Sequence, residues 1–206
     1  MKKTVVRRIG AVVVATALLF SLGGCPCLFG GAVFFPDAAL ESAVRNALDK
    51  PFGCISKSEL LEIVELQAAG LQIRDLEGLQ YCKSLTTLNL RSNKIQSISQ
   101  LAGLKDLTWV HLGDNVITNI EPLAGLLRLD YLNLFGDANE VYAWKHLVAN
   151  AQAGGLGLGS TVVLPTRTTL NEDDTIRDDF EGAYNALINA GVTVIFAEPD
   201  GTEIEF

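Results

Sequence analysis

A regular 22-residue period constrains the fold of this chain more than any other feature of the sequence. Each unit opens with an apolar residue, two variable residues, a second apolar residue, one variable residue and a third apolar residue. Three units begin at Leu85, Leu107 and Leu129, and a weaker copy begins at Ile63. A fixed period of this length predicts that copies of one short structural unit stack along the chain. The second half of each unit repeats too, in the apolar sets Ile73, Leu76 and Leu79, then Ile95, Ile98, Leu101 and Leu104, then Ile117, Ile120, Leu123 and Leu126.

The spacing within a unit predicts a short strand, a turn and a return segment. The second and third apolar residues lie two apart, so both point to one side of a strand. Asn93 and Asn115 follow the strand, where an amide side chain can bond backbone groups of its own and the neighbouring unit. The return segment is expected to form 3₁₀ turns, and units must stack because none buries its apolar side alone. The alternative, an amphipathic helix pair, is disfavoured by three in-phase copies and two asparagines.

This pattern, L-x-x-L-x-L-x-x-N, resembles the leucine-rich repeat, and the length of its unit resembles that of the bacterial internalin-like class. The resemblance implies an α/β solenoid, a short horseshoe with a parallel sheet on its concave face. It also implies a role in protein binding, without naming the partner. The repeats are expected to span residues 63–136.

Residues 1–24 are predicted to be a signal peptide. Four basic residues near the start of the chain precede an uncharged apolar run that ends at Leu22. This run is shorter than the ~20 residues that a membrane-spanning helix needs. Leu22-Gly23-Gly24-Cys25 resembles the lipobox of bacterial lipoproteins, which implies that Cys25 is acylated and becomes the mature N-terminus. An ordinary secreted protein or an uncleaved anchor is the alternative, and residues 25–33 are expected to be a short tether.

The charge of the chain bears on its partners. Cleavage before Cys25 removes four basic residues, which changes the formal net charge from −8 to −12. An acidic surface repels phosphate backbones, so nucleic acid is not expected as a partner. The acidic residues after Asn171 are expected to form a solvated face. The protein is therefore expected to be exported and held in the bacterial cell envelope by the lipid on Cys25.

Residues 34–62 are expected to form a helical N-terminal cap over the first repeat. Asp37 is placed to cap a helix that must end before Pro51, because proline cannot continue a helix. Ser56-Lys57-Ser58-Glu59 matches a capping box and predicts a second short helix. Together these helices would cover the apolar side that stacking leaves bare at the first unit.

Residues 137–206 are expected to form an enlarged α/β C-terminal cap that continues the same sheet. The repeat breaks after Leu134, because position 137 is Asp where the pattern requires Asn, and Asn139 stands where it requires an isoleucine. A helix is predicted over residues 141–150, a glycine-rich turn over 154–159 and a strand over 161–164. A second helix over 173–190, with Ile188 among its inward residues, and a strand over 192–196 complete the predicted fold.

No set of residues predicts catalysis, a cofactor or a metal site. The glycines of Gly155-x-Gly157-x-Gly159 follow a helix and open a strand, whereas phosphate-binding loops follow a strand and open a helix. His111 and His146 lie in different units, and no cysteine, serine or carboxylate pattern makes either of them part of a nucleophile or ligand set. The chain is therefore not expected to be an enzyme.

Two cysteines of the expected folded domain leave two readings open. Cys82 occupies the interior position that Leu104 and Leu126 hold in later units, so a buried thiol is its default role. Cys54 lies in the loop expected to fold over this unit, and export favours oxidation. Free thiols are favoured over a possible Cys54–Cys82 disulfide.

The concave sheet is the candidate binding surface. Residues that alternate with the buried ones form columns across neighbouring strands, and strand spacing of about 4.8 Å makes members of a column neighbours. Aromatic side chains and arginine anchor many interfaces. The alternative is that Trp109 and Phe135 only pack against the C-terminal cap. The candidate binding residues are Arg91, Trp109, His111, Tyr131, Asn133 and Phe135.

These features predict a membrane-anchored, extracytoplasmic module that binds an unidentified protein through its concave face and is a monomer. The alternative is a structural or self-associating scaffold of the cell envelope, which makes contact through a sheet edge or the acidic cap. The oligomeric state separates the two hypotheses.

Overall fold

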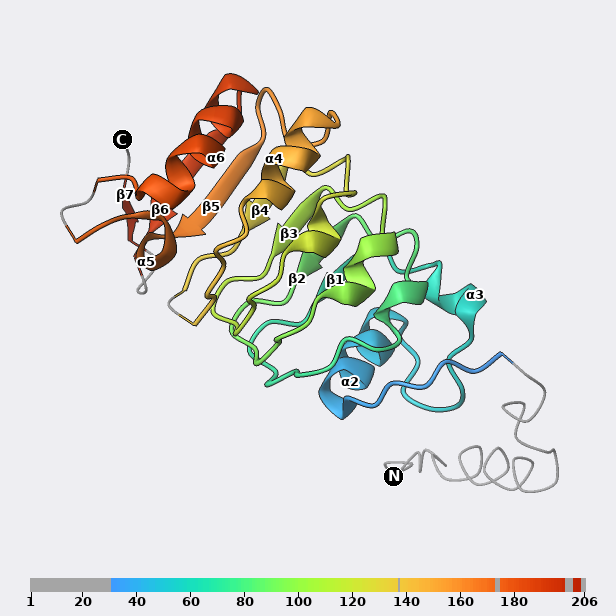
Figure 1. Ribbon diagram of the computed structural model, residues 1–206. Coiled ribbons are helices and arrows are strands. Elements are labelled where there is room, and N and C mark those ends of the chain that lie inside the picture. The colour runs from blue at the N-terminus through green and yellow to red at the C-terminus, as the bar shows by residue number, and fades with distance from the viewer. Residues whose placement is uncertain (1–30, 137, 173–174, 199–201, 205–206) are drawn as a thin grey trace, which may run out of the picture. The chain divides into compact units, whose positions relative to one another are not determined.

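A computed structural model describes residues 31–136, 138–172, 175–198 and 202–204 (Figure 1). By its internal contacts the chain divides into Met1–Ala32 and Val33–Phe206. The predicted signal peptide and the acylation site Cys25 lie outside the described residues.

The part of the chain from Val33 onward is built on one seven-stranded sheet, in which the strands follow chain order from β1 to β7. The first six strands are parallel, and β7 pairs antiparallel with β6. Glu65 pairs with Thr87, Thr87 with Trp109, and Trp109 with Tyr131, so the structural period equals the predicted one. The predicted solenoid is therefore confirmed. Its strands are β1 (Glu65–Gln67), β2 (Thr87–Asn89), β3 (Trp109–His111), β4 (Tyr131–Asn133), β5 (Thr161–Pro165), β6 (Thr193–Ala197) and β7 (Glu203–Ile204).

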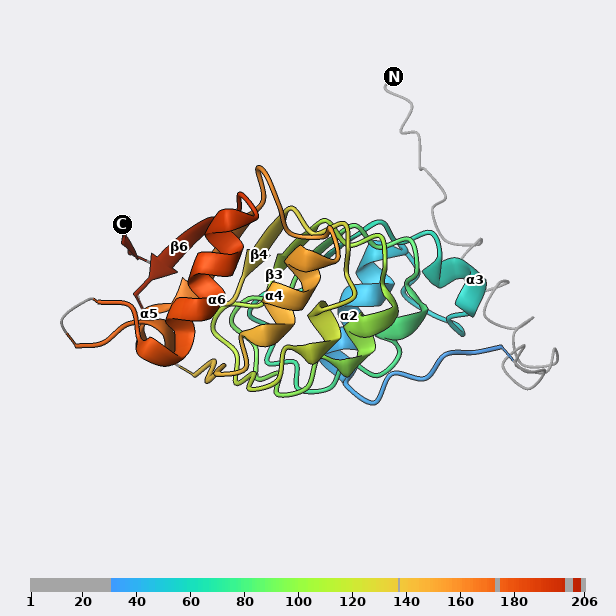
Figure 2. The same ribbon diagram turned by 45° about the horizontal axis from the view of Figure 1, so that its top comes forward.

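One face of the sheet is covered by the return segments (Figure 2). In the regular repeats these are the short 3₁₀ helices η2 (Leu79–Tyr81), η3 (Ser99–Gly103) and η4 (Glu121–Leu123), as predicted. The hydrophobic core lies between these segments and the sheet, and every apolar residue of the repeat pattern is buried in it. The opposite face of the sheet carries no helix among the described residues and is called the open face below.

After β4 the units grow because α-helices replace the 3₁₀ turns. The step between paired residues becomes longer than the period, from Tyr131 to Thr161 and then from Thr161 to Thr193. Helices α4 (Lys145–Gln152) and α6 (Asp178–Asn189) pack against each other on the covered face. Short helix α5 (Thr166–Thr169) and strand β7 were not predicted. Ile188, expected to point inward, is exposed, and within the described residues α6 begins five positions later than predicted.

A ladder of buried asparagines joins the turns of successive units. Asn93 Oδ1 accepts the backbone N–H groups of Leu71 and Ile73, and Asn115 Oδ1 accepts that of Ile95, in each case in the preceding unit. The amide group of each asparagine donates to backbone carbonyls of its own and the preceding turn. These bonds satisfy polar groups that stacking would otherwise bury without partners.

The ladder does not stop where the sequence pattern breaks. Asn139 Oδ1 accepts the N–H of Ile117 at 2.9 Å, and its amide donates to the carbonyls of Leu112, Leu134 and Phe135. Asn139 stands two positions later than the period of Asn93 and Asn115 would place the next asparagine. It was predicted to replace a core isoleucine, and this was wrong: two inserted residues move the third rung along the chain without removing it.

One position in the turn of each unit has a left-handed backbone. Positive φ angles recur at equivalent positions of successive units, at Gly70 (70°), Ser92 (56°), Asp114 (55°) and Gly136 (107°). At Gly136 the space is also restricted, because an added Cβ would lie 2.8 Å from the backbone N of Asp114. Glycine is therefore required there by both conformation and packing.

The N-terminal end of the sheet is met by helix α2 (Ala38–Ala47), which packs against β1. Asp37 caps this helix as predicted, because its Oδ1 accepts the N–H groups of Ala39 and Leu40. Its second oxygen accepts the N–H of Arg74 at 2.7 Å and so links the helix to the first repeat. The predicted capping box of Ser56 and Glu59 opens helix α3 (Lys57–Leu60).

The two cysteines have different states. Cys82 is a free, fully buried thiol, and burial raises its pKa to about 12. Cys54, in the loop after α2, is disulfide-bonded, so its partner is not Cys82. The buried thiol is confirmed, and both the possible Cys54–Cys82 bond and a free Cys54 were wrong.

Candidate functional site

The open face of the sheet presents two columns of side chains, as predicted. Strand register places Glu65, Thr87, Trp109 and Tyr131 side by side. In each of these three-residue strands the central residue points into the core, so the side chains of the first and third residues point to the open face. The second column contains Gln67, Asn89, His111 and Asn133.

Aromatic rings occupy the middle of the open face. Trp109 and Tyr131 stack with ring centroids 5.1 Å apart and planes 7° from parallel. His111 lies 5.8 Å from the Trp109 ring in a tilted arrangement. The Tyr131 hydroxyl accepts a hydrogen bond from Asn133 Nδ2 at 3.0 Å. All three rings are half-buried, so each combines fixed packing on one side with an exposed surface on the other.

Phe135 and Asn133 are buried, although both were predicted as solvent-facing binding residues. Phe135 is 4% exposed and packs in a second apolar cluster with Val163 of β5 and Ala197 of β6. Asn133 is 6% exposed, and its Oδ1 accepts the N–H of Phe135. The alternative that Phe135 packs against the C-terminal strands is therefore correct, whereas Trp109 packs against Tyr131. Phe135 and Asn133 therefore pack beneath the exposed side chains of the site and do not form its surface.

Gly113 provides the space for this packing. An added Cβ at Gly113 would lie 2.6 Å from two carbons of the Phe135 ring and 2.8 Å from His111 Cε1. His111 and Phe135 form an edge-on pair with centroids 5.8 Å apart. A glycine at this position thus lets the two rings meet across neighbouring strands.

Arg91 lies over the ring of Phe135, at the edge of the aromatic side chains of β3 and β4. Its guanidinium carbon lies 4.9 Å from the centroid of Phe135, and its Nε donates to Asp114 Oδ2 at 3.2 Å. Asp114 also accepts a hydrogen bond from Ser92 Oγ. The Arg91 side chain is 47% exposed, so its charge is shared between an internal ion pair and the solvent.

His111 is held in its neutral form. Its Nδ1 accepts the backbone N–H of Gly113 at 3.2 Å, which assigns the ring proton to Nε2. Burial, followed by the positive charge of Arg91, lowers the pKa of His111 to about 4, and Asp114 acts in the opposite direction. At neutral pH the ring therefore offers one N–H donor and no charge.

The side of the open face next to the aromatic rings is polar. Asn89 Nδ2 donates to Gln67 Oε1 at 3.0 Å, and Gln67 Nε2 donates to Glu65 Oε1 at 2.8 Å. The open face thus changes from hydrogen-bonding side chains on β1 and β2 to aromatic rings on β3 and β4. On β5 and β6 it ends in the apolar side chains of Val163 and Ile195.

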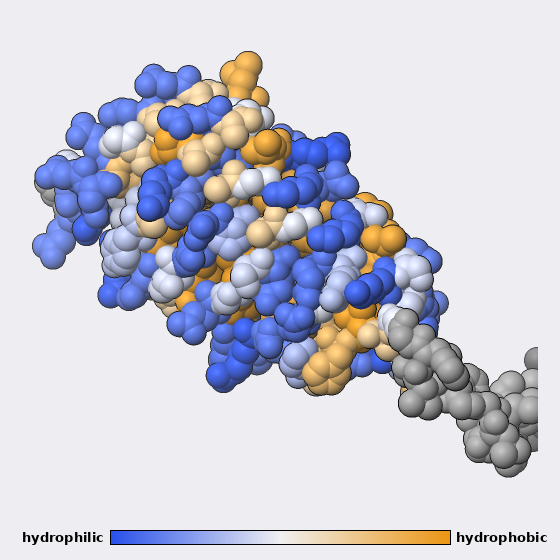
Figure 3. Space-filling view, turned by 45° about the vertical axis from the view of Figure 1, so that its right-hand side comes forward, coloured by the Kyte–Doolittle hydropathy of each residue, from blue (hydrophilic) through white to orange (hydrophobic). Residues whose placement is uncertain are grey.

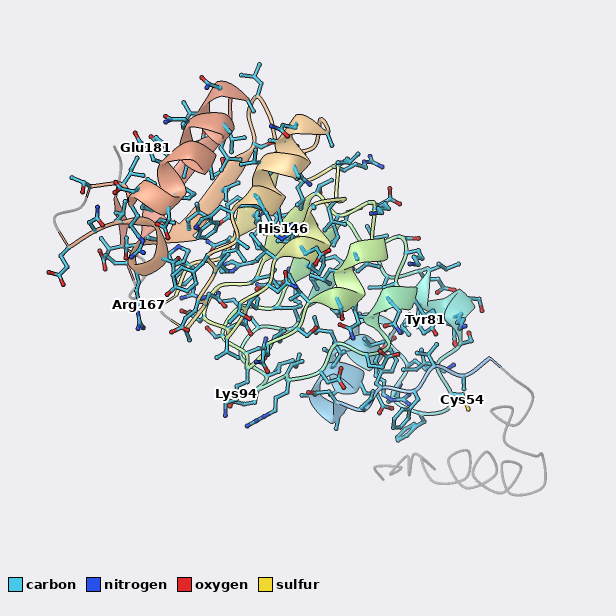
Figure 4. The ribbon with its side chains drawn as sticks, viewed as in Figure 1. Cys54, Tyr81, Lys94, His146, Arg167 and Glu181 are labelled. Carbon is cyan, nitrogen blue, oxygen red and sulfur yellow. The ribbon has the colours of Figure 1, made fainter. Side chains whose placement is uncertain are left out.

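The other sequence features do not join this site. His146 lies on helix α4, on the covered face of the sheet (Figure 4), and so is separated from His111. The glycine-rich turn lies between α4 and β5, and Gly155 leaves room for the buried Asn150, whose Oδ1 accepts the N–H of Leu156. Within the described ranges, no three His, Cys, Asp or Glu side chains lie close enough to hold a metal ion.

Sequence reasoning missed the residues that the enlarged units contribute. Val163 and Ala197 support Phe135, and Asn150 donates to the carbonyls of Leu123 and Leu126 on the covered face. None of these residues falls on the 22-residue period. The observed register places Val163 beside Asn133, whereas the alternation of the predicted strand at 161–164 gives only the face on which Val163 lies.

Comparison with known proteins agrees with this geometry. A leucine-rich-repeat family model matches residues 83–138. The crystal structure of an internalin, inlF, from Listeria monocytogenes superposes with a TM-score of 0.62 at 25% identity, covering 80% of this chain and 43% of that one. Internalin C2 from the same species gives a TM-score of 0.62 at 23% identity, covering 80% of this chain and 66% of that one. This chain thus spans less than two thirds of either internalin. It is a leucine-rich-repeat solenoid with an internalin-like fold.

Proposed function

We propose that this protein is a membrane-anchored, extracytoplasmic module that binds another protein through the open face of its sheet. Leucine-rich-repeat solenoids are general protein-interaction folds. The observation that carries the proposal is the half-buried Trp109–Tyr131 stack at the centre of that face. Tryptophan, tyrosine and arginine dominate the binding energy of interfaces when they lie at the centre of a contact.

The stack is suited to binding because it is preorganised. Trp109 and Tyr131 project from neighbouring strands whose register is fixed by backbone pairing. His111 supports the Trp109 ring, and Asn133 holds the Tyr131 hydroxyl. Side chains already held in one conformation lose little entropy when a partner covers them, so more of the contact energy appears as affinity. The polar side chains of β1 and β2 would then provide the hydrogen-bonding rim.

The anchoring part of the proposal rests on the sequence before residue 33. A basic segment, an apolar run and Leu22-Gly23-Gly24-Cys25 together support export and acylation of Cys25. Within the described part of the chain, no helix is long and apolar enough to cross a membrane. Intact-mass analysis of the native protein should therefore show residues 1–24 absent and a diacylglyceryl-type mass on Cys25. An unmodified Cys25 in a soluble mature chain would contradict the anchor.

The binding part can be tested by comparative capture from a cell-envelope extract. The wild-type domain and two variants would serve as baits: Trp109→Ala on the open face, and Tyr142→Ala as an exposed aromatic control before α4. A protein captured by the wild type and by Tyr142→Ala, but lost with Trp109→Ala, supports the open face as the binding surface. Equal capture by all three baits would contradict it.

The alternative of a self-associating scaffold predicts a different result in solution. A binding module of this kind should elute as a monomer in size-exclusion chromatography at micromolar concentration, once the acyl chain and detergent are removed. A dimer or larger species that persists under these conditions would favour the scaffold. Loss of that species with Trp109→Ala would assign the self-contact to the open face.

A further inference from the structure

The end of the domain where the described chain begins carries exposed apolar side chains in two adjacent loops. Phe34 is 78% exposed and Phe52 is 85% exposed, and Pro36 and Pro51 beside them are also exposed. Figure 3 shows apolar surface gathered at this end of the molecule. Two largely exposed phenylalanines in adjacent loops form an apolar surface of the kind that can mark an interaction site.

Backbone contacts bring the two loops together. The N–H of Val33 donates to the carbonyl of Ile55 at 2.7 Å, so the strand of chain that holds Phe34 runs beside the loop that holds Phe52. Phe35 points the other way, because it is buried and its ring fills the space above Gly78. With Phe35 fixed in the core, Phe34 is directed outward.

The second loop is held in its protruding form. The Arg45 guanidinium donates to the carbonyls of Lys50 and Gly53, at 3.3 and 3.0 Å, on either side of Phe52. These bonds close the loop at its base and leave Pro51, Phe52 and Gly53 exposed at the tip. Phe52 is thus presented to the outside by a constrained loop.

The two basic residues at the base of this loop are paired with carboxylates. Arg45 forms an ion pair with Glu41 at 2.7 Å, and Lys50 forms one with Glu59. Pairing lowers the free energy of moving these groups toward a medium of low polarity. Phenylalanine is among the side chains that enter the boundary between lipid headgroups and acyl chains, and the tip of this loop presents one.

We infer that Phe34 and Phe52 form a membrane-contact surface that inserts into the interfacial region of a phospholipid bilayer. The inference rests on the proposed lipid anchor. Eight peptide steps separate Cys25, the acylation site, from Val33, the first residue of the folded domain. Such a segment spans at most about 29 Å when fully extended. Acylation of Cys25 therefore confines these two phenylalanines to the neighbourhood of the bilayer and raises their effective concentration there.

Membrane contact at this end has a consequence for the binding site. The strands follow one another from β1, beside helix α2, toward β6. At a strand spacing of about 4.8 Å, β4 lies roughly 14 Å farther along the sheet than β1. Insertion of Phe34 and Phe52 would thus leave the aromatic group of β3 and β4 clear of the lipid and accessible to a partner.

The direct test places a fluorophore at the tip of the loop. Phe52→Trp in the anchored protein would be reconstituted into vesicles of phosphatidylethanolamine and phosphatidylglycerol containing nitroxide-labelled lipid. Leu158→Trp, at a position that is 95% exposed in the turn before β5, is the matched control. Emission is measured as the difference from the parent protein, which contains Trp109 and Trp144. Phe52→Trp should be blue-shifted and quenched by the labelled lipid, and Leu158→Trp should be neither.

Quenching of Phe52→Trp no greater than that of Leu158→Trp would overturn the inference. A blue shift without lipid that depends on protein concentration would instead assign the surface to a second copy of the chain, and would also overturn it. If mass analysis shows that Cys25 carries no lipid, the anchor has failed and the surface can still be judged by adding the vesicles to the unmodified protein. There, Phe34→Ser with Phe52→Ser should weaken vesicle binding by about tenfold or more.

Discussion

Trp109 and Tyr131 lie face to face across β3 and β4, with ring planes 7° from parallel. They occupy the same position in successive units, so the repeat itself creates the pair: equivalent positions become neighbours in space. The open face therefore acquires a paired aromatic surface from two residues at one position of the repeated unit, while the buried positions beside them, Val110 and Leu132, stay apolar. This separation of surface from core is what allows function and stability to be tested independently.

Loss of one ring of this pair should destabilise the domain only modestly. Trp109→Ala removes a stacking contact of about 0.5–1.5 kcal/mol together with part of a half-buried surface. Leu88→Ala or Leu112→Ala should cost about 2–5 kcal/mol, because each opens a cavity between stacked units. Urea unfolding of the three variants measures the difference. A Trp109→Ala cost as large as that of the leucine variants would show that the ring is part of the core.

The shifted rung of the asparagine ladder should be as important as the regular one. Asn139→Ala leaves the buried N–H of Ile117 and the carbonyl of Leu134 without this partner, so a loss of about 3 kcal/mol is expected. The carbonyls of Leu112 and Phe135 each lose one bond but keep those from Asn115 Nδ2 and from the Asp114 N–H. Asn115→Ala should cost a similar amount. Asn119→Ala, at an exposed position with a single bond to Glu121, is the control. An Asn139→Ala variant as stable as the control would show that the ladder ends at Asn115.

The cysteines should differ sharply in labelling. Burial raises the pKa of Cys82 to about 12, so its thiol should resist alkylation in the native state and react after denaturation without reduction. The peptide containing Cys54 should become labelled only after reduction, because that residue is disulfide-bonded. Mass spectrometry of digests provides the measurement. A peptide that links Cys54 to Cys82 in the unreduced digest would contradict the structure.

Protonation of His111 should weaken the folded state. Its pKa is lowered from 6.5 to about 4, so between these values the unfolded chain binds more protons than the native one. The contribution of neutral His111 to stability is thus present above about pH 6.5 and is lost as the pH falls toward 4. Arg91→Met removes the neighbouring positive charge and should raise the pKa of His111, as followed by NMR titration. An unperturbed pKa near 6.5 in the wild type would contradict the burial of this ring.

The regular part of the fold was predictable because the repeat determines strand position, register and burial together. Leu88, Val110 and Leu132 lie at one position of the period, pair in register and are all buried. The 3₁₀ turns were predictable because the period leaves too few residues between successive strands for a long α-helix. The capping residues Asp37 and Ser56 were predictable for a local reason, since a cap bonds the first turn of its own helix.

The remainder depended on contacts that no fixed spacing encodes. Asn139 was missed because two inserted residues shift it from its rung. Phe135 lies at the position that exposed Arg91 holds two units earlier, yet it is buried because the longer units place Val163 and Ala197 beside it. The bonded state of Cys54 was missed, and the second reading, a bond to Cys82, was wrong too, because the loop that holds Cys54 lies outside the repeat. In each case the missing information was the geometry of an irregular segment.

We propose the Trp109–Tyr131 pair as the centre of the protein-binding surface. Its most direct test is the Kd of the purified captured partner for the wild type, Trp109→Ala, Tyr131→Ala and the control Tyr142→Ala. We predict that each open-face variant weakens binding by about 30-fold or more, equivalent to about 2 kcal/mol, with the fold intact. The control should change the Kd by less than about threefold. A partner that binds both open-face variants as tightly as the wild type would contradict the claim.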